Sequence, residues 1–203
     1  MRASSKMLLP PFGSFYAAGA AHLKTQAEII RQAGKKRQNP PHFNIANAQE
    51  TELAAADFYH LRKFSRPPDR QKPKMLIVAP MSGHYASILR DTVDGMLDTH
   101  DVTIVDWKNP RDIPLSKGRF DFEKYMECLA DVLQDMGPET HVMGISQSTV
   151  PLLAVSAWLA EHHPKSAPRS MTLIGGPIDT RASKSRLHDF IRRMPLDQLQ
   201  RHV

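Results

Sequence analysis

The feature that most constrains this chain is an apolar segment that runs into a sharp turn and then an apolar helix, at residues 140–155. Its centre, Gly-Ile-Ser-Gln-Ser at residues 144–148, is close to the pattern G-x-S-x-G, in which a strained strand-to-helix turn presents a serine hydroxyl at the edge of a parallel sheet. Gly144 supplies the small residue that this turn requires, whereas Ser148 carries a Cβ where the second glycine is usual. Because serine is also a favoured helix N-cap, the pentapeptide alone leaves a structural role for Ser146 open.

From residue 74 onward the chain alternates short apolar strands with helices. The expected strands and helices are 74–79, 87–97, 101–107, 122–136, 140–145, the helix from the turn to about residue 162, and 170–175. This alternation predicts an α/β fold of the α/β-hydrolase type, a mostly parallel sheet with helices on both faces. Only one strand follows the predicted elbow helix, so we expect a sheet that is incomplete at the C-terminus and exposes an apolar edge strand.

The N-terminal part is patterned less regularly. A helix is predicted at 18–33, residues 50–64 are ambiguous between helix and strand, and a polar helix is predicted at 183–193. We therefore expect two parts: an N-terminal segment, 1–66, partly irregular or helical, and a partial α/β-hydrolase domain, 67–203.

Charge and composition narrow the possible partners. The net charge is +6, but the basic residues are scattered and follow no RNA-binding or zinc pattern, so we expect no nucleic-acid partner. The single cysteine, Cys128, lies in a predicted amphipathic helix and is interpreted as a packed thiol in a reducing compartment. Residues 7–20 loosely resemble a signal peptide, but prolines interrupt them and they are too short to span a bilayer. No metal-ligand cluster or cofactor motif is present, so no cofactor is expected.

Loops that follow parallel strands meet at one edge of a sheet, where ligands bind. The loop at 80–85 follows the strand where this fold keeps half of its oxyanion hole, so we expect the N–H groups of Met81 and Ser82 to act with that of Gln147. Asp179, after the last predicted strand, and His84, in the same loop as Ser82, are the possible supporting residues.

The general base is harder to find in the sequence. The fold's usual order is Ser, then Asp or Glu, then His. Downstream of Ser146 the histidines are His162, His163, His188 and His202, and none follows a strand as a catalytic histidine would. Asp106 and Asp179 both follow or end strands, but turn and cap roles are the commoner use of aspartate at such positions.

Four segments together resemble intracellular polyhydroxyalkanoate (polyhydroxybutyrate) depolymerases: residues 78–93, 103–107, 146–153 and 169–181. The resemblance covers roughly residues 67–193. It implies an α/β-hydrolase that cleaves ester bonds of polyester granules in a bacterial cytoplasm, with Ser146 as nucleophile, where many relatives have cysteine. Ser148 stands where those relatives commonly have proline.

The resemblance also implies that the catalytic Asp and His come from a part that follows residue 193 in relatives, so we expect a C-terminally truncated depolymerase. Two alternatives remain open. One is a granule-binding remnant without catalysis. The other is a different acyl hydrolase or an acyltransferase with the same elbow. The expected partner is the polymer or the granule surface, with no membrane span and with an oligomeric state that the sequence leaves open.

Overall fold

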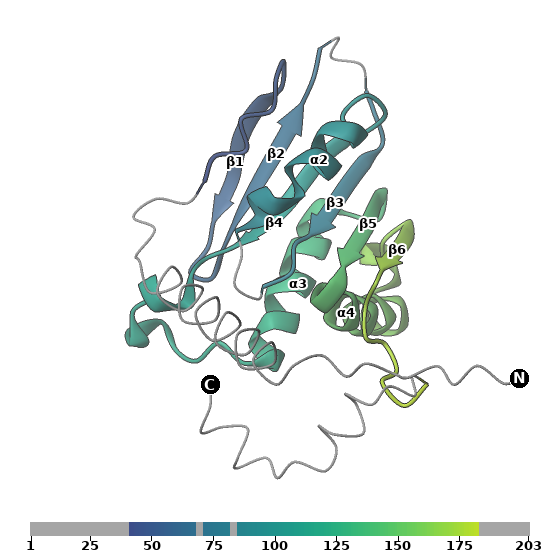
Figure 1. Ribbon diagram of the computed structural model, residues 1–203. Helices are drawn as coiled ribbons and strands as arrows, with labels where there is room; N and C mark the ends of the chain where they lie inside the picture. Colours follow the sequence, from purple (N-terminus) through teal and green to yellow (C-terminus); the bar gives the residue numbers. More distant parts are fainter. Residues whose placement is uncertain (1–40, 68–70, 82–84, 183–203) are drawn as a thin grey trace, which may run out of the picture. The chain divides into compact units, whose positions relative to one another are not determined.

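The computed structural model describes residues 41–67, 71–81 and 85–182 (Figure 1). All of them belong to one compact unit that begins at Pro41. The helices expected at 18–33 and 183–193 lie outside the described residues, as do Ser82 and His84.

The unit is built on a six-stranded sheet, ordered β1-β2-β4-β3-β5-β6. The strands are β1 (Gln49–Ala55), β2 (Tyr59–Ser65), β3 (Lys74–Val78), β4 (Asp101–Trp107), β5 (Thr140–Ile145) and β6 (Ser170–Ile174). Strands β3 to β6 pair in parallel, whereas β1 pairs antiparallel with β2 and β2 antiparallel with β4. The prediction of a mostly parallel α/β sheet is therefore confirmed.

The helices cover both faces of this sheet (Figure 1). They are α2 (Arg90–Met96), preceded by the short η1 (Ala86–Leu89), then α3 (Phe122–Met136) and α4 (Thr149–His162). The step from β3 to β4 runs in one direction across the sheet, and the steps from β4 to β5 and from β5 to β6 run in the other. Right-handed crossovers therefore place α2 on one face and α3 with α4 on the opposite face.

The ambiguous residues 50–64 form the β1–β2 hairpin. In β2 the buried side chains Leu61 and Phe64 face the core, whereas every residue of β1 is exposed, so β1 carries no burial pattern that a sequence could reveal. The expected boundary after residue 66 thus falls on the connection between β2 and β3, two strands of the same sheet.

Burial follows position in the sheet. Leu76, Ile77 and Val78 of the central strand β3 are all fully buried because helices cover both faces there. At the β6 edge, Met171 and Ile174 are 37% and 46% exposed. Among the described residues no strand pairs with the outer edge of β6, so the predicted apolar edge is present.

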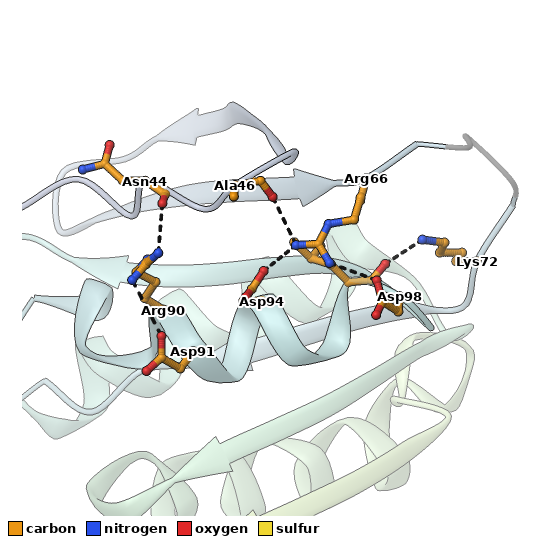
Figure 2. Close-up of polar contacts among 9 residues, drawn as sticks. Asn44, Ala46, Arg66, Lys72, Arg90, Asp91, Asp94 and Asp98 are labelled. Atoms are coloured by element: carbon orange, nitrogen blue, oxygen red, sulfur yellow. Dashed lines mark hydrogen bonds and ion pairs between the residues drawn. The ribbon is translucent and has the colours of Figure 1, made fainter.

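The segment before β1 is clamped onto α2 by two arginines (Figure 2). The guanidinium of Arg66, at the end of β2, donates to the carboxylates of Asp94 and Asp98 on and just after α2, and to the carbonyl of Ala46. Arg90 makes a weaker set of contacts: it donates to the Asn44 carbonyl at 3.2 Å and lies 3.8 Å from Asp91. Beneath the clamp, Phe43 and Phe64 pack ring against ring in the core.

We predict that Arg66→Gln lowers the thermal midpoint of unfolding and that Arg90→Gln lowers it less. Arg66 joins three elements of the structure, and its loss leaves the carboxylates of Asp94 on α2 and Asp98 just after it without this counter-ion. Circular-dichroism melts of both variants at low and high salt test this. Equal midpoints for the two variants would contradict the assignment of Arg66 as the main clamp.

A pair of histidines lies at the amino-terminal ends of the strands, whereas Ser146 follows the carboxyl end of β5. The rings of His100 and His141 meet edge to face, with centroids 6.1 Å apart. Burial, and secondarily the neighbouring His141, lowers the pKa of His100 from its ordinary value of 6.5. The unfolded chain therefore takes up a proton at His100 more readily than the folded chain does.

The consequence is a pH-dependent stability. Because the pKa of His100 is lowered in the folded state, its contribution to the free energy of unfolding is fully present above pH 6.5 and is lost as the pH falls below that value. We expect the urea midpoint to fall between pH 7.5 and pH 5, to fall less in His100→Asn, and to fall by an intermediate amount in His141→Asn. A decline that is the same in all three proteins would show that other groups cause it.

Candidate active site

Ser146 sits at the junction of β5 and the elbow helix in a backbone conformation that serine rarely adopts. Its φ is +58°, and the only other non-glycine residues with positive φ among those described are Asn44 and Asn47. Asparagine tolerates the left-handed region, whereas for other L-residues it costs roughly 1–2 kcal/mol. Ser146 is exposed. A strained, exposed serine between a parallel strand and a helix is the geometry that the sequence pattern predicted.

Gly144 lets the strand and the helix approach each other. A Cβ on this residue would lie 2.9 Å from Cδ2 of Leu152 and 3.2 Å from Cα of Thr149, both in α4. Gly176, after β6, plays the same part from the other side, because a Cβ there would lie 1.6 Å from Oγ1 of Thr149. The elbow is therefore enclosed by backbone on two sides.

Two buried hydroxyl groups brace the turn. The Thr149 hydroxyl donates to the Ser146 carbonyl at 2.8 Å. The Ser148 hydroxyl accepts from the Ile145 N–H at 2.8 Å and lies 2.7 Å from the carbonyl of Val78, the last residue of β3. Both side chains are fully buried. They hold the left-handed conformation of Ser146 in place.

The end of β3 is held from its other side as well. The indole N–H of Trp107, the last residue of β4, donates to the Ala79 carbonyl at 2.9 Å. Two residues further on, Met81 is half-buried against the core. The loop that the sequence assigned to the oxyanion hole therefore starts from a fixed point. Gln147, the other expected donor, is exposed and directly follows Ser146.

An aromatic cluster lies beside Met81 at the carboxyl end of β4. Trp107 packs on Tyr125 and Phe120, with ring centroids 4.4 and 5.8 Å away, and Phe120 packs on Phe58 at 4.8 Å. A small, mostly apolar hollow opens here, lined by Phe58, Met81, Trp107, Lys108, Pro110, Ile113 and Phe120. This hollow could not be predicted from the sequence, because its residues come from four separate segments.

Asp106 is a buried carboxylate with structural partners. It accepts from Nε of Arg62 on β2 at 3.0 Å and from the Ala86 N–H, at the start of η1, at 3.3 Å. Burial opposes a charge on Arg62, but its hydrogen bonds to Glu50 and Asp106 outweigh this and raise its pKa. Asp106, which lies within β4, thus connects that strand to β2 and to the start of η1.

Asp179 lies after β6 and is engaged by Arg181. Its carboxylate accepts from the Arg181 backbone N–H and Nε at 2.9 Å and from the second guanidinium nitrogen at 3.0 Å. The hydrogen bond to Asp179 raises the pKa of Arg181. These contacts with Arg181 close a local turn after β6.

No hydrogen bond joins Ser146 to a histidine among the described residues. His100 and His141 lie at the amino-terminal ends of β4 and β5, and His162 and His163 lie at the C-terminal end of α4. His60 bonds Glu52 and sits on β2, three strand spacings from β5, or about 14 Å. Within the described ranges no side chain hydrogen-bonds the Ser146 hydroxyl.

Cys128 is a packed thiol, as predicted. It is 6% exposed within α3. Burial raises its pKa, which keeps it protonated and a poor nucleophile.

In the part of the chain that the structure describes, no three metal-ligating side chains gather. No helix there combines the length and the apolar character needed to cross a bilayer.

Comparison with known proteins gives matches at the level of structure. No family model matches the sequence, and neither does any curated protein. A candidate esterase from Staphylococcus aureus matches with a TM-score of 0.52 at 15% identity, over 92% of this chain and 60% of that one. A membrane phospholipase A, described as a bacterial virulence factor, matches with a TM-score of 0.52 at 15% identity, over 90% and 58%.

A candidate lipase from Acinetobacter baumannii also matches at 15% identity, over 92% of this chain and 53% of that one, with a TM-score of 0.49. The chain therefore spans less than two thirds of the length of these three proteins. Together with the sheet order and the elbow, the matches establish the predicted α/β-hydrolase fold.

We predict that Gly144→Ala destabilises the protein by about 1–3 kcal/mol, because the added methyl group overpacks the junction of β5 with α4. The matched control is Gly95→Ala on the exposed side of α2. A Cβ there meets nothing within 4 Å, so alanine should stabilise by about 0.5–1 kcal/mol through helix propensity. Urea unfolding measures both. A Gly144 variant as stable as wild type would contradict the close approach.

Proposed function

We propose that this protein is a carboxylic ester hydrolase in which Ser146 is the nucleophile. The observation that carries the proposal is the left-handed, exposed Ser146 at the β5–α4 junction, a strained conformation that the surrounding contacts maintain. The esterase and phospholipase descriptions of two structural neighbours agree with it.

In the proposed reaction Oγ of Ser146 attacks the ester carbonyl while a base takes its proton. The N–H groups of Gln147, Met81 and Ser82 stabilise the oxyanion. The alcohol leaves with that proton, and water then hydrolyses the acyl-enzyme. We assign no base among the described residues. His84 and His188, which lie outside them, are the histidines to substitute, and Asp179 is the candidate to orient the base.

We further propose polyhydroxyalkanoate, with polyhydroxybutyrate as the first polymer to test, as the substrate, and the cytoplasmic granule as the place of action. The support is the sequence resemblance at 78–93 and 169–181. Another acyl hydrolase, or an acyltransferase with the same elbow, is the alternative.

One observation favours a second candidate function, binding to polyester granules without hydrolysis. The Ser146 hydroxyl has no described hydrogen-bond partner, and a serine without a base is a weak nucleophile. This candidate predicts that the chain sediments with granules but releases no 3-hydroxybutyrate.

The test compares wild type, Ser146→Ala and Ser116→Ala. The control serine is exposed on the short helix η3 (Leu115–Lys117), which follows β4. We expect a fluorophosphonate probe to label wild type and the control at Ser146, and Ser146→Ala to lose hydrolysis by roughly 10³-fold or more. Amorphous polyhydroxybutyrate granules, p-nitrophenyl butyrate and tributyrin serve as substrates.

Each outcome separates the candidates. Hydrolysis confined to the granules supports the polyester substrate, and hydrolysis confined to the small esters supports another acyl hydrolase. Sedimentation with granules without labelling or release supports the binding function. Unchanged turnover in Ser146→Ala would refute the assignment of the nucleophile.

A further inference from the structure

Ser148 occupies the position where the elbow pattern has glycine, and it is fully buried. Its hydroxyl contacts three backbone groups: it accepts from the Ile145 N–H at 2.8 Å and lies 2.7 Å from the Val78 carbonyl and 3.0 Å from the Ile145 carbonyl. A hydroxyl has one hydrogen, so the shorter contact, to Val78, takes it. Ser148 therefore links the two ends of the elbow turn to a neighbouring strand.

That link falls at a functionally important point of the sheet. Val78 ends β3, and Met81 follows it by three residues. The next carbonyl, of Ala79, accepts from the Trp107 indole. Two consecutive carbonyls at the end of β3 are thus held from opposite sides, one by the elbow and one by β4.

We propose that Ser148 is a positioning residue that fastens the nucleophile elbow to the segment bearing the second oxyanion donor. This inference rests on the proposed function. An oxyanion hole requires donors from two separate segments to converge on one oxygen at about 2.7–3.1 Å. The Ser148–Val78 hydrogen bond connects the segment of Gln147 to the segment of Met81 and so sets their spacing.

Glycine at this position would restore the usual pattern but would lose the link. The Ile145 N–H and the Val78 carbonyl would each lose a buried partner, and the left-handed Ser146 would lose one of its braces. The sequence pattern alone therefore predicts that Ser148→Gly is neutral or beneficial, whereas the structure predicts impairment.

The kinetic test uses Ser148→Gly and Ser148→Ala in the full chain, with p-nitrophenyl butyrate as substrate. The controls are Ser156→Gly and Ser156→Ala. Ser156 is a buried serine of α4, the helix that follows Ser148, and its hydroxyl has no hydrogen-bond partner among the described residues. We expect kcat and the rate of fluorophosphonate labelling to fall about 10- to 100-fold in both Ser148 variants with KM unchanged. A general loss of folding would lower the fraction of active protein and would affect hydrolysis and labelling equally. Thermal melts of all four variants measure whether folding is lost.

A second measurement does not depend on activity. Hydrogen–deuterium exchange of peptides covering 143–149 and 76–81 should accelerate in both Ser148 variants and not in the Ser156 controls. Unchanged exchange would overturn the inference, as would unchanged kcat in an active enzyme. An unlabelled, inactive wild type would count against the proposed function alone, and the exchange result would still decide whether Ser148 fastens the elbow.

Discussion

The close approach of β5, α4 and the end of β6 is the constraint on which the candidate site depends. Gly144 and Gly176 leave no space for a Cβ against α4, and Thr149 is buried between them. With the backbones this close, the chain can leave β5 and enter the helix only through a sharp turn, and Ser146 takes the left-handed conformation that makes it. The strain is local, and packing and hydrogen bonds from three strands offset it.

The regular part of the fold could be predicted because its signals are local. Strands β3, β4, β5 and β6 are short apolar runs, and the prediction gave each boundary to within one residue. The hairpin could not be predicted in this way. All side chains of β1 are exposed, so burial imposes no alternation on its sequence, and the alanine-rich segment forms a strand because β2 offers it a pairing edge.

In the candidate site, too, the features set by local sequence could be predicted and those set by long-range contacts could not. Ser146 and Gly144 follow from a five-residue pattern, because the strained turn and the close helix require those residue types. The hydrogen bonds from Ser148 to Val78, from Trp107 to Ala79 and from Ala86 to Asp106 could not be predicted, because each joins residues at least 20 positions apart in the sequence. The sequence showed Ser148 as a departure from the pattern, and only its contacts give that departure a physical role.

These contacts also separate two requirements of catalysis. The groups that hold the elbow, from Val78 to Gly176, all lie within the described residues, so the geometry of the nucleophile does not depend on where the base comes from. A serine hydroxyl in the correct geometry is still weakly nucleophilic until a base takes its proton. Nucleophilic attack by Ser146 therefore requires a base supplied to a turn that is already formed.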